Sequence, residues 1–299
     1  MRSILPLIIC LGLFFSGPAT GQQTMPADYS AVLTSLGRQG DFKDGVLKVN
    51  IPRSDLKFVI DGVATPTSFG FGGWIALTKG TGMDVMMGDL VLTENEVNPV
   101  MSAVLDAGLD VTAVHNHFFY ETPRIFYMHV HGHGTAADLA AKIKPALALI
   151  GKNPPSTSPT STGRSIEGKM DVAQLAKIIG HEGELNGSVY KITIGRSDLS
   201  MKEMGAPISA RMGLNTWAAF YGSDSDAVVA GDVAMLESEV PTVLRALRGN
   251  GIEVVSMHHH MIGTQPTIIF LHYWGKGEAQ KLARGVKAAV DPLGKRARK

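Results

Sequence analysis

The chain has 299 residues, of which 44% are hydrophobic and 18% charged, which is typical of a globular protein and excludes a disordered or coiled one. Its 28 basic and 27 acidic side chains nearly cancel, which argues against a nucleic-acid binder that relies on a basic face. The single cysteine, Cys10, lies close to the N-terminus, so the remaining chain can form no disulfide and has no thiolate ligand for a metal.

The first 21 residues have the pattern of a secretory signal peptide. Arg2 supplies a positive start, residues 4–15 form an apolar run, and small residues precede Gln22. The run is shorter than the about 20 apolar residues that span a bilayer. We therefore predict a signal peptide over 1–21, a periplasmic or secreted protein, and no transmembrane segment in the mature chain.

The segment that follows predicts an alternation of helices and strands. In chain order the pattern indicates a short helix ending at 33–37, strands at 46–51, 74–78 and 85–92, a helix at 95–107, strands at 111–119 and 124–130, and a helix at 135–149. This order predicts an α+β sandwich, with a mainly antiparallel sheet and helices on one face.

A series of unusual residues recurs 143 positions later without a net gap. Arg53-Ser54-Asp55-Leu56 falls on Arg196-Ser197-Asp198-Leu199, Trp74 on Trp217, and Gly88-Asp89 on Gly231-Asp232. Most surrounding residues differ, so the repeated ones were needed twice. We predict two tandem repeats related by a pseudo-two-fold axis, as in a homodimer. Repeat 1 covers 22–150, a Pro/Ser/Thr-rich linker covers 151–169, and repeat 2 covers 170–299 with a basic C-terminal tail.

Each repeat keeps three histidines in its last hairpin. They are His115, His117 and His129 in repeat 1, and His258, His260 and His272 in repeat 2. Side chains alternate along a strand, so these residues share one face. A turn centred on Pro123 would place His117 opposite His129 and His115 opposite His131. The other face is apolar, so we expect the histidine face to be the one that solvent can reach.

Three neighbouring imidazoles predict a site for a divalent transition metal, zinc or copper(II), with one site per repeat or one shared between them. The competing interpretation is a set of structural hydrogen bonds. Four repeated glutamates and Asp89 are candidates to complete or support such a site; the glutamates are Glu94, Glu96, Glu237 and Glu239. Glu94 and Glu96 also open a predicted helix, where Thr93 and Glu96 fit a capping box.

The segment Ser256-Met257-His258-His259-His260-Met261, through Pro266 to Leu271-His272-Tyr273-Trp274, resembles the LppY/LpqO-like family of exported bacterial proteins. Val114-His115-Asn116-His117, through Pro123 to Met128-His129, fits the same pattern. The resemblance covers nearly the whole chain after the predicted signal peptide. It implies a location in the bacterial envelope, but the family has no established reaction and lends no catalytic residue.

Three functions follow as hypotheses. The first is an exported protein that binds a transition metal, which the presence of both histidine sets favours. The second is a metal-dependent hydrolase, in which Glu94 or Glu96 acts as general base on a metal-bound water. The third is a module that binds an envelope glycan or peptide through tryptophans, namely Trp74, Trp217 and Trp274.

Overall fold

The computed structural model describes residues 23–156 and 162–295. The predicted signal peptide lies outside these residues, and so does nearly all of the basic tail. Within the described ranges, no helix combines the length and the apolar character needed to cross a membrane.

The first repeat is a six-stranded antiparallel sheet with the order β1-β2-β5-β6-β9-β7, covered by three helices. Its elements are α1 (Ala27–Leu36), β1 (Gly40–Lys43), β2 (Val46–Pro52), β3 (Phe58–Ile60), β4 (Val63–Thr65), η1 (Thr67–Phe69), β5 (Gly72–Lys79), β6 (Asp84–Thr93), α2 (Glu94–Asp106), β7 (Asp110–His115), β8 (Glu121–Thr122), β9 (Ile125–Gly134) and α3 (Ala136–Leu149).

The second repeat has the same architecture, with the strand order β10-β11-β14-β15-β17-β16. Its elements are α4 (Val172–Ile179), β10 (Gly183–Asn186), β11 (Val189–Gly195), β12 (Lys202–Glu203), β13 (Ala206–Pro207), η2 (Ala210–Met212), β14 (Asn215–Gly222), β15 (Ala227–Leu236), α5 (Val240–Gly249), β16 (Glu253–His258), β17 (Ile268–Gly277) and α6 (Ala279–Val290). The predicted α+β class with two tandem repeats is therefore confirmed.

Helix α2 shows how the local sequence sets these elements. The Thr93 side chain accepts a hydrogen bond from the backbone three residues on, and Glu96 accepts one at 2.8 Å from the Thr93 N–H, so a capping box starts the helix. Val100 and Val104 point to the sheet and are fully buried. Gly108, at φ +71°, turns the chain into β7, because this left-handed conformation is costly for other residues.

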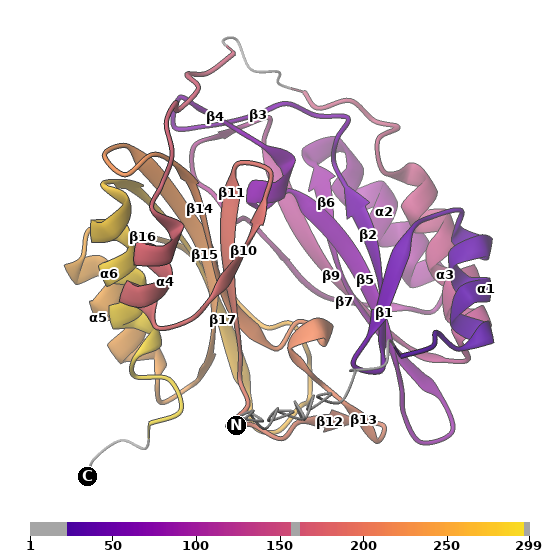
Figure 1. Cartoon of the computed structure of the whole chain (residues 1–299). Coiled ribbons are helices and arrows are strands. Elements are labelled where there is room, and N and C mark those ends of the chain that lie inside the picture. Colours follow the sequence, from indigo (N-terminus) through magenta and orange to yellow (C-terminus); the bar gives the residue numbers. More distant parts are fainter. Residues whose placement is uncertain (1–22, 157–161, 296–299) are drawn as a thin grey trace, which may run out of the picture.

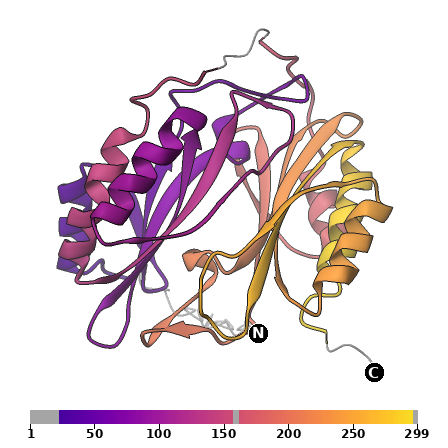
Figure 2. The same cartoon turned by 180° about the vertical axis from the view of Figure 1, so that it is seen from behind.

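The two sheets face each other and the helices lie outside them, which gives four layers (Figures 1 and 2). Helices α1 to α3 flank the first sheet, and α4 to α6 flank the second. One apolar core fills the space between sheet and helices in each repeat. Two further apolar clusters combine residues of both repeats and join the inner faces of the sheets. The repeats therefore share a buried interface.

Each repeat extends a short hairpin arm onto the other. In the arm β3–β4, Phe58 and Ile60 pack in one cluster with Val228 and Trp274 of the second repeat. The arm β12–β13 lies at the opposite end of the interface, where Ala206 joins a cluster that contains residues of the first repeat. This reciprocal exchange follows a pseudo-two-fold relation and positions side chains of one repeat against the sheet of the other.

The segment between the repeats crosses from one to the other along the arm β3–β4. Arg164 exchanges backbone hydrogen bonds with Gly62 and Ala64, at 2.8 and 3.0 Å. Its guanidinium forms an ion pair with Asp226 of the second repeat. The described part of the predicted linker is thus attached to both repeats.

Two expectations about the histidine hairpin need correction. His115 pairs with Tyr127, and Ala113 pairs with His129, so the predicted register with His115 opposite His131 and His117 opposite His129 is wrong. Strand β7 ends at His115 and β9 begins at Ile125, so the pairing centres on Glu121 and not on Pro123; the irregularity between Val111 and Ala113 shifts it by one residue only. The histidines do lie on the face opposite the helices, but the sheet of the other repeat covers that face.

Candidate metal centre

The six predicted histidines gather in one cluster at the interface between the repeats. His115, on β7, and His129, on β9, meet their equivalents His258, on β16, and His272, on β17. Solvent reaches at most 7% of His115, His117, His129 and His272. Of the two predicted alternatives, one site per repeat or one shared between them, the arrangement resembles the shared one, because histidines of both repeats come together.

The Nε2 atoms of this cluster converge. The Nε2 atom of His115 lies 3.2 Å from that of His272 and 3.2 Å from that of His117. His129 and His258 have the same Nε2–Nε2 distance, 3.2 Å. Zinc binds imidazole nitrogen at about 2.0–2.1 Å, which puts two nitrogens of a tetrahedral site about 3.3 Å apart. The spacing therefore suits a common ion.

Two groups of three buried histidines are able to hold a metal ion. They are His115, His117 and His272, and His115, His129 and His258. Both groups take residues from both repeats. The exchange of a histidine across the interface follows from the facing sheets, which bring the Nε2 atom of His129 on β9 to 3.2 Å from that of His258 on β16.

The cluster repeats itself about the pseudo-two-fold axis. In the triangle His115, His117, His272 the ring centroids are 5.1, 3.5 and 5.0 Å apart. In the mirrored triangle His258, His260, His129 the corresponding distances are 5.1, 3.9 and 5.1 Å. Each triangle takes a His-x-His pair from one repeat and its third ring from the other.

Backbone carbonyls set the tautomer of the two histidines from the central strands. The Nδ1 atom of His129 lies 3.3 Å from the Gly88 carbonyl, and that of His272 lies 3.2 Å from the Gly231 carbonyl. A carbonyl only accepts, so Nδ1 carries the proton and donates it in both rings. Their Nε2 lone pairs are then directed into the cluster, as in histidines that bind metals.

Burial keeps the imidazoles neutral. It lowers the pKa of His129 to about 4 and that of His272 to about 3. The pKa values of His115 and His117 fall well below the usual value of 6.5, because burial is reinforced by repulsion from neighbouring histidines, His272 first. Neutral imidazole is the form that binds a metal, so the rings are ready to act as ligands near pH 7.

A polar cavity of 480 Å³ opens beside the cluster, between the two sheets. His117, His260 and His272 form part of its wall. Trp74 and Trp217 also line it, so these predicted tryptophans do reach a cavity. The third predicted tryptophan, Trp274, is packed in an apolar cluster, with 4% of its surface exposed.

Charged groups from both repeats meet in this cavity. The Lys48 ammonium lies 4.4 Å from the Trp74 ring centroid, and its repeat equivalent Lys191 lies 4.3 Å from that of Trp217. Burial lowers the pKa of each lysine to about 8. Neither lysine was among the predicted site residues, although their separation of 143 positions, the interval of the repeat, is a signal for both.

Two aspartates lie behind the histidines. Asp232 is 3% exposed and its Oδ2 lies 3.7 Å from His260 Nε2. Burial raises the pKa of Asp89 to about 8 and raises that of Asp232 well above its usual range. Asp89 Oδ1 is buried without a hydrogen-bond partner among the described residues. These carboxyls can hold or release a proton next to the cluster.

The candidate glutamates take other positions. Glu96 is fully buried, and an oxygen of its carboxylate lies 2.6 Å from the Arg53 guanidinium; Glu239 pairs with Arg196 at 2.8 Å. Among the described residues, none of the four glutamates belongs to a group able to hold a metal. The other two candidates lie nearer the surface, since Glu94 is partly exposed and Glu237 is exposed. The structure therefore gives the buried pair a role in capping and ion pairing.

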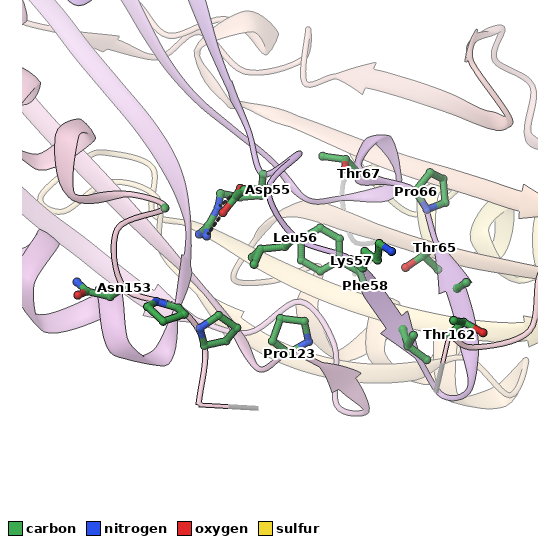
Figure 3. Close-up of a pocket in the computed structure, with 16 residues that line it drawn as sticks. Asp55, Leu56, Lys57, Phe58, Thr65, Pro66, Thr67, Pro123, Asn153 and Thr162 are labelled. Carbon is green, nitrogen blue, oxygen red and sulfur yellow. Dashed lines mark hydrogen bonds and ion pairs between the residues drawn. The ribbon is translucent and has the colours of Figure 1, made fainter. Parts of the chain in front are cut away.

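A second cavity, of 1020 Å³, lies in the first repeat away from the histidines (Figure 3). Its wall includes Leu56, Phe58 and Pro66, and Asp55 lies beside it in contact with Arg53. The wall contains none of the six predicted ligands.

A third histidine group lies at one end of the interface. It consists of His131 and His133 from β9 and Glu203 from the arm β12–β13. His131 was predicted to lie beside the histidines of repeat 1, but Glu203 was not among the predicted residues. No comparison between the repeats could find Glu203, because the residue 143 positions earlier is Ile60.

The fold and the clusters together define a protein with two tandem α+β repeats whose shared interface holds buried histidine groups able to bind a metal ion. The family model described as Domain of Unknown Function (DUF1259) matches residues 30–149 and again 173–292, so the chain belongs to this family and carries its domain twice. The predicted duplication is thereby confirmed.

Solved structures give weaker similarities. EtuB from Clostridium kluyveri has 10% identity and a TM-score of 0.20, over 84% of this chain and 90% of that chain. The trimeric bacterial microcompartment shell protein PduB has 12% identity and a TM-score of 0.21, over 85% and 89%. TM-scores this low say nothing about this chain. No curated protein matches significantly.

Proposed function

We propose that this protein binds a divalent transition metal, zinc or copper(II), in the histidine cluster between its repeats. The observation that carries the proposal is the convergence of Nε2 atoms at 3.2 Å, from two repeats, in a buried and neutral set of rings. Nitrogen ligands without thiolates suit both metals.

The cluster fits a metal better than a structural role. Structural histidines are held by hydrogen bonds from both ring nitrogens, since an unpaired buried polar atom costs about 1–3 kcal/mol. The Nδ1 atoms of His115, His117 and His258 have no such partner among the described residues. Neutral rings with lone pairs directed at one another gain most from a shared cation.

The location is part of the same proposal. The signal-peptide pattern of residues 1–21 and the resemblance to LppY/LpqO-like exported proteins support a periplasmic or secreted protein. In that setting the protein would bind or sequester the metal outside the cytoplasm. Fractionation of cells that express the full chain tests this location. We expect mature protein that begins near Gln22 in the exported fraction.

Elemental analysis of untagged protein, after zinc and copper(II) have each been offered and the excess removed, tests metal binding. We expect at least one tightly bound ion per chain. His272→Phe keeps a planar ring of similar size but removes a ligand, and we expect it to reduce the metal bound by His115 and His117 of the other repeat.

His259→Ala is the matched control, because this exposed neighbour lies in the same motif and belongs to no ligand group among the described residues. It is expected to leave the metal content unchanged. Circular dichroism confirms that both variants fold. Equal metal content in the parent and in His272→Phe, or negligible content in the parent, contradicts the proposal.

A second candidate function, metal-dependent hydrolysis, is favoured by the cavity beside the cluster. A ligand in this space would lie against His117, His260 and the two lysines, with Asp89 and Asp232 within the same wall. An aspartate of raised pKa keeps its proton near pH 7, so it can donate a proton to a leaving group, and it can take one from a metal-bound water only above that pKa. The acid–base role then belongs to the aspartates instead of to Glu94 or Glu96.

Chromogenic carboxyl esters and phosphoesters, offered to the zinc-loaded protein, test this second candidate. Turnover that falls in Asp232→Asn while the metal content stays constant supports it. Turnover that is absent from the loaded parent favours metal binding alone, and turnover that is unchanged in that variant excludes Asp232 from the reaction.

A further inference from the structure

One end of the interface carries a histidine group of its own. His131 and His133 are two residues apart on β9, so their side chains leave the same face of the strand. The Nε2 atom of each lies 2.9 Å from the same carboxylate oxygen, Oε1 of Glu203. Glu203 belongs to the arm β12–β13, so the group joins the two repeats.

Hydrogen bonding leaves part of this group unsatisfied. His133 has hydrogen-bond geometry towards Glu203 Oε1. His131 Nε2 is buried and has no hydrogen-bond partner of good geometry among the described residues, and neither has Glu203 Oε2. A carboxylate oxygen and two imidazole nitrogens that converge with spare lone pairs form a ligand set suited to zinc.

An open cavity gives access to the group. It has a volume of 720 Å³, and its wall includes His131, His133 and Glu203 together with Thr112 and Gln265. Glu203 is 16% exposed and His133 27%. The group therefore has room for a fourth ligand such as water, which is the usual arrangement where three protein side chains bind zinc.

The opposite end of the interface is built differently. The positions equivalent to His131 and His133 hold Trp274 and Lys276. Trp274 is packed against Phe69 and Phe118, and Lys276 forms an ion pair with Asp61 at 2.8 Å. Apolar packing and one exposed ion pair close that end. The histidine group is thus present at one end of the interface and not at the other.

We propose that His131, His133 and Glu203 form a second site for a divalent transition metal, zinc, which is separate from the histidine cluster and links the arm of repeat 2 to the sheet of repeat 1. Its three ligands differ from the six of the cluster, so it can bind its ion whether or not the cluster does.

Zinc and cobalt(II) titrations of the full chain test the proposal. Glu203→Gln keeps the size and one hydrogen-bond acceptor but removes the anionic ligand. We expect this variant to bind one ion fewer per chain than the parent, and to lose more affinity at that site than the about 10- to 100-fold that an outer-shell change costs. The visible absorption of cobalt(II) should lose one component.

Two variants keep the test specific. Lys202→Gln changes the exposed neighbour of Glu203 and should match the parent. His272→Phe should lose metal from the cluster and still bind the ion at Glu203, which separates the two proposals. His133→Ala gives a second route if Glu203→Gln does not fold.

Identical stoichiometry and cobalt spectra for the parent, Glu203→Gln and His133→Ala would overturn the second site. If the parent binds more than one ion, loss of every bound ion in Glu203→Gln would also overturn it, since the site would then not be separate.

Discussion

The two ends of the interface started from equivalent positions and now differ. At one end, Glu203 of an arm contacts His131 and His133. At the other, Ile60 belongs to the same apolar cluster as Trp274, and Asp61 forms an ion pair with Lys276. Between them, the six histidines keep nearly the same distances about the pseudo-two-fold axis. The difference teaches that the centre was held constant in both repeats while the ends were free to change.

The helix-capping ion pairs were held constant as well. Arg53 contacts Asp55 and Glu96 in the first repeat, and Arg196 contacts Asp198 and Glu239 in the second. The hydrogen bonds from arginine to aspartate have the same lengths in both, 2.9 and 2.8 Å. Symmetric features are therefore expected to respond equally to matched substitutions, and the ends unequally.

Acidification of the metal-free protein probes the symmetric centre and has the largest expected effect. The buried rings stay neutral in the folded chain, whereas those of the unfolded chain take up protons below their usual pKa of 6.5. The stability present above pH 6.5 is therefore lost as the pH falls, by about 1.4 kcal/mol per pH unit for each net proton.

Asp89 and Asp232, whose pKa values are raised, oppose this trend, but two aspartates face six histidines. Urea unfolding in the presence of a chelator at pH 7.5, 6.0 and 5.0 measures the slope. His181→Ala, which removes an exposed ring, should leave it unchanged. A flat profile between pH 7.5 and 5 would show that the cluster is not buried and neutral.

Arg53→Met and Arg196→Met compare the two repeats directly. Each leaves a buried glutamate carboxylate without its charged partner, which costs about 3–5 kcal/mol of unfolding free energy. We expect similar losses in both variants by urea unfolding. Arg284→Met, on an exposed helix face, serves as the control. A large loss in one repeat alone would break the symmetry argument.

Asp89→Asn has a smaller effect of opposite sign. The folded chain holds a proton on Asp89 up to a pKa of about 8, while the unfolded chain releases it near 3.8, so the native residue costs more stability as the pH rises through this window. The amide removes that cost. We expect a gain of about 1–3 kcal/mol at pH 8 and less at pH 5.

Thermal unfolding of parent and variant at the two pH values measures this gain, and Asp232→Asn should change in the same direction. A gain that is larger at pH 5 than at pH 8 would mean that the carboxyl is ionised in the folded chain.

Lys276→Met probes the diverged end and should cost least. Both partners of the ion pair with Asp61 are exposed, so we expect the variant to lose less than about 1 kcal/mol of unfolding free energy. This loss should become smaller at high salt, because salt screens the pair. A double-mutant cycle with Asp61→Ala isolates the pair. A coupling of several kcal/mol would show that this end, too, depends on a specific polar contact.

The sequence predicted the elements that have a clear hydrophobic period and the residues that the duplication repeats. The helix predicted at 95–107 is α2, Glu94–Asp106, and the strand at 85–92 is β6, Asp84–Thr93. The same comparison identified all six histidines. Residue alternation fixes which face of a strand a side chain takes, and the histidines do lie opposite the helices.

The partner of that face could not be predicted. Alternation along β9 says nothing about which sheet covers His129, and the irregular pairing of β7 depends on contacts that no local pattern records. Glu203 was missed because it has no counterpart in the first repeat. Lys48 and Lys191 were missed although they recur, because a lysine on a strand is usually a solvated residue.

The covalent joining of the repeats has a consequence for what the protein can carry. In an assembly of two identical subunits every substitution appears at both poles, so a histidine gained near one arm is gained near the other. Fusion into a single polypeptide removes that obligation. A glutamate at position 203 and an isoleucine at position 60 can therefore coexist. One molecule can then have two chemically different ends of its interface on either side of a symmetric histidine cluster.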